Sequence, residues 1–201
     1  MRTPLALKLL CLVVFPSISS AQQTTLDLGT LTLDQLADRA ATIVVSTVTN
    51  RQSEWENDGA SRLIITKVTM AVEQTLKGSA PRTLVVEVLG GTIGEQTLRV
   101  SHVPEFKVGD RDVLFLNNSV HAASPLVGSD QGRFRVMNEA ATGTARVLSA
   151  AFAPLVSPAD IGATVESGRN RALVRALSDA IPLSDFVTLI RDRVRQLERR
   201  R

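Results

Sequence analysis

The sequence predicts a mainly β protein: a small antiparallel β-barrel, closed or half-closed, with a short helix before it and a helical appendage after it. Three observations predict this fold class. The middle of the chain holds about five candidate strands of uneven length, their short connections suit an antiparallel path, and glycine residues stand where strands would bend. A β-sandwich is the alternative architecture.

The first 21 residues have the pattern of a secretory signal peptide. Arg2 and Lys8 give a basic start, Leu9–Phe15 is a short apolar core, and the small residues Ser19–Ala21 suit a signal peptidase. The apolar core is far shorter than the ~20 residues needed to span a bilayer. We expect cleavage after Ala21 and a periplasmic or extracellular protein; an uncleaved anchor is the alternative.

Composition limits what the mature chain, residues 22–201, can do. Cys11 is the only cysteine and lies in the signal peptide, so no disulfide or thiol chemistry is expected. The whole chain carries a net charge of +3, of which Arg2 and Lys8 supply two charges. With no tyrosine, one tryptophan and six phenylalanines, the chain has few aromatic side chains for a nucleic-acid surface. No nucleic-acid partner is expected.

The N-terminal elements begin with a helix. Thr32 and Gln35 form a capping-box pattern, and a helix of about two turns follows them. Thr42–Arg51 alternates as a strand, and Gln52–Ser61 is interpreted as a polar loop with a turn at Asn57-Asp58-Gly59.

The central strand pair spans Ser61–Gly91. The more apolar side of the first strand would carry Ile64, Thr66, Val68, Met70, Val72, Gln74 and Leu76. Its β-branched residues argue against a helix. Lys77-Gly78 ends this strand, Thr83–Leu89 forms the next one, and Gly90-Gly91 gives a bend.

Four elements complete the predicted β domain. They are a short strand in Thr92–Val100, a loop at Pro104–Asp112, a strand at Val113–Asn117 that is buried on both faces, and a hairpin. The hairpin begins at Phe134 and Val136, turns at Asn138–Gly143 and returns at Ala145–Leu148.

The C-terminal quarter changes composition. Residues 149–168 are rich in alanine and proline and are interpreted as a linker, and 169–201 as a helical segment. A helix at Arg169–Ala180 ends before Pro182, and Ser184 would cap a second helix whose apolar stripe is Phe186, Ile190, Val194 and Leu197. The predicted organisation is a signal peptide (1–21), a β-barrel domain (33–148), a linker (149–168) and this segment.

The order of several short motifs resembles a known group of proteins. The motifs are Ala37-Asp38 before Ile43-Val44-Val45, Leu76-Lys77-Gly78, Gly90-Gly91, Phe106-Lys107-Val108-Gly109-Asp110, Val113–Leu116 and Gly132–Val136. Over Leu33–Leu148 the chain resembles exported bacterial proteins of unknown function and, more distantly, the netrin-like domain of tissue inhibitors of metalloproteinases. The resemblance implies an OB-like antiparallel barrel. Those inhibitors chelate the protease zinc through an N-terminal cysteine, which the mature chain lacks, so no inhibitory residue can be transferred to it.

The candidate chemistry is sparse. The only histidines are His102 and His121. With Asp110 or Asp112 they could in principle form a metal site, but their spacing does not match known ligand patterns. Exposed loop histidines are therefore expected, and no metal is predicted. No Gly-x-Ser-x-Gly stretch is present. Gly90–Gly94 lacks the Lys-Ser/Thr of a phosphate loop. No catalytic residue and no cofactor is predicted.

Trp55 is the best single candidate for a binding anchor, with Glu54 and Glu56 beside it. The alternatives are a tryptophan folded back over the barrel end and acids that are merely solvated. The six arginines within Arg191–Arg201 could contact anionic lipid, but a solvated helix end favoured by the helix dipole is the preferred interpretation.

The predicted function is an exported, non-catalytic binding module whose partner is an exported or envelope protein. One alternative is an envelope structural or accessory protein anchored through the helical tail. Another alternative is a metalloprotease-inhibitor-like protein that acts without the cysteine-based mechanism. An enzyme of unusual type is a further alternative, but no residue pattern supports it.

Overall fold

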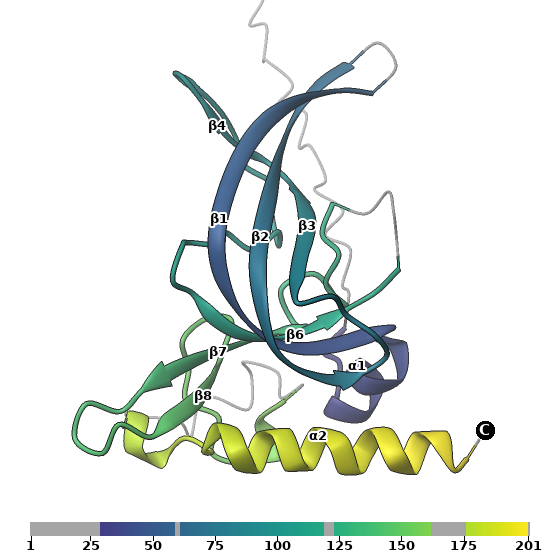
Figure 1. Ribbon diagram of the computed structural model, residues 1–201, viewed down its shortest axis with the longest axis vertical. Helices are drawn as coiled ribbons and strands as arrows, with labels where there is room; N and C mark the ends of the chain where they lie inside the picture. Colours follow the sequence, from purple (N-terminus) through teal and green to yellow (C-terminus); the bar gives the residue numbers. More distant parts are fainter. Residues whose placement is uncertain (1–28, 59–60, 119–122, 162–175, 201) are drawn as a thin grey trace, which may run out of the picture.

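The computed structural model describes residues 29–58, 61–118, 123–161 and 176–200. These residues form a six-stranded antiparallel sheet in the order β3-β2-β1-β6-β7-β8, a two-stranded hairpin β4-β5 and two α-helices (Figure 1). The strands are β1 (Thr42–Asp58), β2 (Ser61–Lys77), β3 (Thr83–Leu89), β4 (Gly91–Ile93), β5 (Gln96–Leu98), β6 (Arg111–Leu116), β7 (Arg133–Asn138) and β8 (Ala145–Ser149). The helices are α1 (Leu33–Arg39) and α2 (Leu183–Glu198), with 3-10 turns η1 (Pro158–Asp160) and η3 (Leu177–Asp179).

The sheet stays open within the described ranges. β3 and β8 lie at its two ends, and no strand pairing joins them. The mainly β, antiparallel fold class with a short N-terminal helix and a C-terminal helix is confirmed. The sequence predicted a closed or half-closed barrel; no closed barrel is found in the described residues, and the OB-like barrel stays a prediction.

The long hairpin of β1 and β2 dominates the shape of the molecule. β1 pairs with β2 from Ile43 to Asp58, but with β6 only over Thr42–Thr47. Three register shifts fall between Ile43 and Asn50, and such bulges bend a strand and increase its twist. The far half of the hairpin therefore curves away from β6 and stands above the rest of the sheet (Figure 1).

The predicted loop at Gln52–Ser61 is wrong, because β1 continues to Asp58 and β2 begins at Ser61. Each residue of Gln52–Asn57 has a cross-strand partner on β2. Much of this ribbon is exposed, so it needs no run of apolar residues, and an ion pair between Glu54 and Lys67 supports the pairing instead.

The buried residues fall into two clusters. The first contains Ile43, Val45, Val113 and Phe115 together with residues of both helices, and the second contains Val44, Val48, Leu114 and Leu116. Because neighbouring residues of a strand point to opposite faces, β6 and the first half of β1 are buried on both sides. The sequence predicted this for the run Val113–Asn117. It is confirmed for Val113–Leu116, whereas Asn117 follows β6 and is half-buried.

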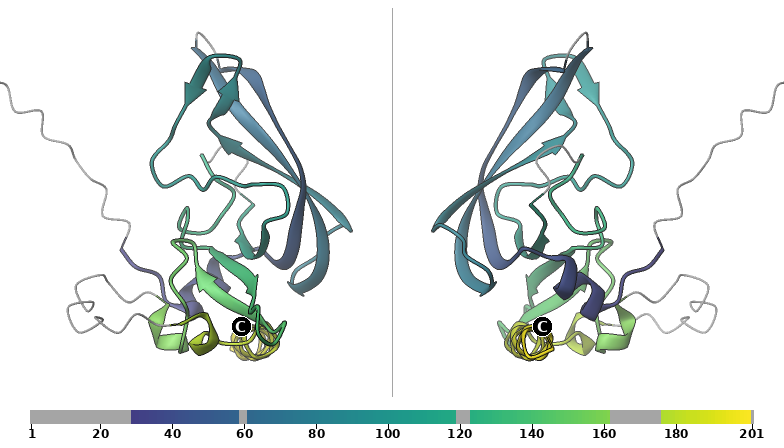
Figure 2. Two further views of the ribbon diagram at one scale, coloured as in Figure 1. Left: turned by 90° about the vertical axis from the view of Figure 1, so that its left-hand side faces the viewer. Right: turned by 90° about the vertical axis from the view of Figure 1, so that its right-hand side faces the viewer.

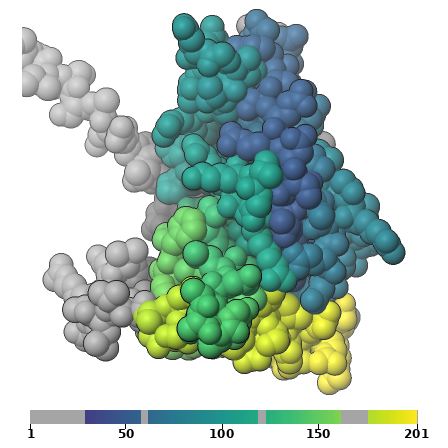
Figure 3. Space-filling view, turned by 60° about the vertical axis from the view of Figure 1, so that its left-hand side comes forward, coloured from purple at the N-terminus to yellow at the C-terminus, as the bar shows by residue number. Residues whose placement is uncertain are grey.

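Helix α2 covers one face of the sheet beside α1 and β8 (Figures 1 and 2). Phe186, Ile190 and Val194 are buried, and the Phe186 ring lies 5.1 Å from that of Phe134 on β7. In the space-filling view α2 lies against the β7–β8 region at one end of the molecule (Figure 3). The apolar stripe predicted for this helix is confirmed.

Ser184 is not the cap of α2, as the sequence had suggested. The helix begins one residue earlier, at Leu183, with Pro182 at the N-cap and no side-chain capping bond. Pro182 has an extended ψ of 145°, and its carbonyl oxygen accepts from the amides of Asp185 and Phe186, so it begins the helix without a side-chain cap. Ser184 Oγ donates instead to Asp185 Oδ1 at 3.1 Å.

Several local predictions are confirmed. The capping box of Thr32 and Gln35 is present, and β3 has the predicted bounds. Gly78 ends β2 with φ of +70°, where a Cβ would collide with the Ala41 carbonyl oxygen. Next to it, Lys77 Nζ donates to the carbonyl oxygens of Ala37 and Ala40 at the end of α1, at 2.7 and 2.6 Å.

Other regions differ from the prediction or lie outside the described ranges. Thr92–Val100 contains the β4-β5 hairpin rather than one strand. Within the predicted linker, Leu155 and Ile161 are buried in the first cluster. Most of the predicted helix 169–180 lies outside the described residues, and its end is the 3-10 turn η3. The signal peptide and His121 also lie outside them. In the part of the chain that is described, no helix is long and apolar enough to cross a bilayer.

The packing of α2 generates a stability prediction. Phe186→Ala should lower the free energy of unfolding by about 3–5 kcal/mol, because the ring is fully buried and its removal leaves a cavity. Urea unfolding of the purified protein measures the change. Thr188→Ala, on the exposed side of the same helix, is the matched control and should change it by less than about 0.5 kcal/mol. An equal effect of both substitutions would contradict the packing role of α2.

Candidate functional site

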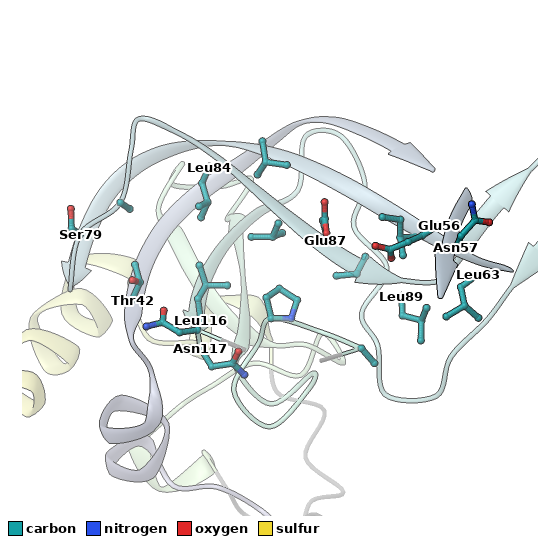
Figure 4. Close-up of a pocket in the computed structure, with 18 residues that line it drawn as sticks. Thr42, Glu56, Asn57, Leu63, Ser79, Leu84, Glu87, Leu89, Leu116 and Asn117 are labelled. Atoms are coloured by element: carbon teal, nitrogen blue, oxygen red, sulfur yellow. The ribbon is translucent and has the colours of Figure 1, made fainter. Parts of the chain in front are cut away.

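A long groove follows the edge strand β3. It has a volume of about 830 Å³ and lies between β3 and the segment that leads out of β6 (Figure 4). We call it the β3 groove. Its lining residues are Thr42, Glu56, Asn57, Leu63, Ile65, Ser79, Ala80, Leu84–Leu89, Leu116–Asn118, Ala123 and Pro125.

The backbone of β3 faces this groove with unused hydrogen-bonding groups. Leu89 N donates outward to Ala123 O at 2.8 Å, whereas Gly90 N donates inward to Ile64 O at 2.7 Å. Since backbone groups of a strand alternate in direction, Val85 and Glu87 point their N–H and C=O outward, as Leu89 does. Among the described residues, no backbone group bonds to Val85 or Glu87 on that side.

The other end of the sheet is protected. β8 forms isolated bridges through Arg146 to Pro182 and through Leu148 to Pro154, so later segments of the chain cover that edge. Proteins usually cover, shorten or charge an exposed edge, since unpaired strands invite association. β3 has an exposed Val85, at 53% of its full area, and only one charged residue, Glu87.

The charges around the β3 groove are acidic. Its lining includes Glu56 and Glu87 and no lysine or arginine. Both glutamates lie beside the cavity in Figure 4. Lys67 is 3.8 Å from Glu87, but its closer partner is Glu54, whose hydrogen bond and charge raise the pKa of the lysine.

The predicted binding residues are not gathered in one site. Glu56 lines the β3 groove and Glu54 pairs with Lys67. Trp55 lies next to Glu56 on β1, but its side chain points to the opposite face of the ribbon, where the Arg62 guanidinium lies 4.4 Å from the ring centroid. The sequence did not indicate the outward groups of Val85 and Glu87, because edge position depends on the strand order.

A second feature is a buried ionic group that we call the Arg133 cluster, formed by Arg133, Asp110, Asp112 and Arg135. Arg133 and Asp112 are each 1% exposed. Arg133 Nη2 donates to Asp112 Oδ2 at 2.8 Å and to Asp110 Oδ2 at 2.7 Å. Arg135 Nη1 lies 3.4 Å from the same Asp110 oxygen. The cluster joins β6, β7 and the loop before β6.

The same arginine holds the preceding loop. Arg133 Nη1 donates to the Glu105 carbonyl oxygen at 2.7 Å, and its guanidinium lies 4.1 Å from the ring centroid of Phe106. Phe106 belongs to the second buried cluster. The Arg133 cluster therefore fixes the loop that covers this core. Two buried atoms, Asp112 Oδ1 and Arg133 Nε, have no hydrogen-bond partner within the described structure.

The two carboxylates of the cluster have opposite pKa shifts. Burial raises the pKa of Asp112, and its bond and charge interaction with Arg133 offset only part of this. For Asp110, partial burial acts in the same direction, but the Lys107 amide and Arg133 outweigh it and lower its pKa. Asp110 accepts from Lys107 N at 2.8 Å.

Beside this cluster lies a cavity of about 580 Å³ whose rim has an unusual backbone. His102, Ser129 and Phe152 are the non-glycine residues with positive φ in the described ranges. His102 and Phe152 line the cavity, and Ser129 precedes Asp130, which also lines it. Phe152 is 54% exposed, and its ring lies 4.1 Å from the Arg135 guanidinium. A phenylalanine in the left-handed backbone conformation is strained, and glycine would adopt this conformation more easily. The contact with the Arg135 guanidinium favours the strained conformation of Phe152.

The residues considered for a metal site are separated by these contacts. Asp110 and Asp112 are both bound to Arg133, and His102 is an exposed loop residue. In the described part of the chain, no group of three or more histidine, cysteine, aspartate or glutamate side chains is placed to hold a metal ion.

Comparison with known proteins gives no match: no family model, no curated protein and no solved structure is similar to this chain.

The lowered pKa of Asp110 gives a pH prediction. The folded state favours the ionised form of the Asp110 carboxylate. The contribution of this carboxylate to the free energy of unfolding is therefore complete above the pKa of an unfolded aspartate, about 4, and is lost as the pH falls below that value. Asp110→Asn should be less stable than the parent near pH 7, and this difference should shrink toward pH 2–3. Urea unfolding across that range measures it; a difference that grows on acidification would refute the assignment.

The strain at Phe152 gives a second prediction. Phe152→Gly and Phe152→Ala both lose the contact with Arg135, but only glycine tolerates the positive φ. The glycine variant should therefore be more stable than the alanine variant by about 1 kcal/mol in thermal or urea unfolding. Equal stability of the two variants would show that residue 152 is not held in this conformation.

Proposed function

We propose that this protein is an exported, non-catalytic binding module that takes an extended polypeptide segment as an added strand along β3. The observation that supports this most is the pair of outward-facing backbone groups at Val85 and Glu87, next to a groove of about 830 Å³. Strand addition uses such groups for affinity and adjacent pockets for selectivity. The partner is an exported or envelope protein that carries the segment.

The dimensions of the β3 groove suit a short extended segment. It touches six consecutive residues of β3, Leu84–Leu89, which correspond to about 20 Å at ~3.3 Å per residue. Its lining combines apolar side chains, such as Leu84, Leu116 and Pro125, with the amides Asn57 and Asn118. An added strand would bury its alternate side chains here and expose the others.

A binding role is favoured over an enzymatic one by the surroundings of the described histidine. His102 makes no hydrogen bond to a serine or a carboxylate in the described structure. A general base needs a positioned partner within hydrogen-bond reach. The described residues that line the β3 groove include glutamates and amides but no histidine or lysine, and His121 lies outside the described residues.

The alternatives from the sequence have less support. An anchor through the C-terminal helix would need an apolar face, and the apolar stripe of α2 is packed against the sheet. A metalloprotease-inhibitor-like role without a cysteine remains a proposal, as does a relation to OB-like barrels, for which the strongly bent β1-β2 hairpin is the supporting feature.

The test is a proline substitution at the exposed edge. Val85→Pro removes an N–H that points outward, so the bonds to β2 stay intact and the protein should still unfold cooperatively. A display library of random heptapeptides provides the probe: selected peptides should bind the parent, protect the Val85 and Glu87 amides from hydrogen exchange, and lose at least tenfold in affinity for Val85→Pro.

Val85→Thr is the matched control, because it alters the side chain but keeps the N–H; it should bind the selected peptides almost as the parent does. Three results would each overturn the proposal. They are a library that yields no binder, binders that leave the β3 amides unprotected, and binders with equal affinity for Val85→Pro.

A further inference from the structure

The face of the sheet beside the β3 groove carries an excess of negative charge. Cross-strand pairing places Glu54 opposite Ile65, Gln52 opposite Lys67, and Lys67 opposite Glu87. Since residues opposite each other share a face, and alternate residues of a strand share one too, Glu54, Glu56, Lys67 and Glu87 all lie on this face. Among the described side chains beside the groove, three carboxylates face one ammonium group.

The single cation is already engaged. Lys67 Nζ is bound to Glu54, and its distance to Glu87 is 3.8 Å. The Glu87 side chain is 55% exposed and lies on the outermost strand, where no further described strand supplies a partner. Glu56 has no ion pair in the described structure and lines the same groove. Lys67 alone cannot neutralise three carboxylates, so Glu56 and Glu87 can still attract a basic group of a ligand.

We propose that the segment bound along β3 is basic: it carries a lysine or arginine opposite Glu87, and apolar residues at the flanking positions. This inference rests on the proposed function and adds the chemistry of the partner. In an added strand, the residue opposite Glu87 shares its face, and its neighbours point with Val86 and Val88 toward the apolar side chains of the groove. Opposite charges in such cross-strand pairs stabilise a sheet, and like charges destabilise it.

A second copy of this chain is a poorer occupant. β3 reads Thr-Leu-Val-Val-Glu-Val-Leu and contains no lysine or arginine. Antiparallel pairing of two β3 strands would place Glu87 opposite Thr83, an apolar residue or the other Glu87. A basic residue of another protein opposite Glu87 supplies a positive charge, which self-pairing cannot supply.

The experiment uses three blocked heptapeptides that alternate valine with lysine, glutamine or glutamate, and the full mature protein. Fluorescence anisotropy at low salt gives the dissociation constants. The lysine peptide should bind at least fivefold more tightly than the glutamine peptide, and the glutamate peptide most weakly. Raising the salt concentration should reduce these differences.

A charge reversal makes the test specific to the site. Glu87→Lys should invert the order, so that the glutamate peptide binds best. Glu95→Lys is the matched control, since Glu95 is an exposed acid in the β4-β5 turn outside the groove, and it should leave the order unchanged.

The outcomes separate the two proposals. If the three peptides bind equally, and Val85→Pro weakens them all, strand addition is right and the basic partner is wrong. If Glu95→Lys inverts the preference as well as Glu87→Lys, the charge effect is general and the assignment to Glu87 is overturned. If none of the peptides protects the β3 amides, strand addition itself fails.

Discussion

The architecture depends on the burial of β6 and of the first half of β1 on both faces. These segments have no solvent face, so they need two separate covers, and the chain supplies them from different regions. Helices α1 and α2 cover one side, and the loop around Phe106, held by Arg133, covers the other. β1 and β2 are longer than either cover, so their far halves extend as a bent ribbon, and β3, paired with this ribbon, is left at an open edge.

The Arg133 cluster connects this framework to the β3 groove. A buried arginine is costly unless it is paired, and two carboxylates and a carbonyl oxygen accept hydrogen bonds from Arg133 here, although its Nε has no partner within the described structure. The loop that it holds places Phe106 in the same buried cluster as Leu116 and Val86, which line the β3 groove. A packed interior thus lies behind an edge strand on which, among the described residues, no backbone group bonds to the outward groups of Val85 and Glu87.

The sequence predicted the parts of the fold that depend on local chemistry. The capping box at Thr32, the bounds of β3 and the doubly buried run in β6 follow from side-chain patterns within a few residues. The far half of β1 was mistaken for a loop because Glu54 and its neighbours are polar, and only pairing with β2 shows that a ribbon can carry them. The open sheet, the buried Arg133 and the free edge at Val85 could not be predicted, since each depends on which distant segments meet.

The position of α2 after all the strands has a consequence for biosynthesis. Strands β1 to β8 are made first, yet Phe115 and Phe134 lack part of their cover until Phe186 and Ile190 have been made. A chain that is shortened before Leu183 lacks this part of the cover and offers an apolar face to proteases and chaperones. A chain that contains α2 hides that face, so resistance to degradation distinguishes chains with this helix from chains without it.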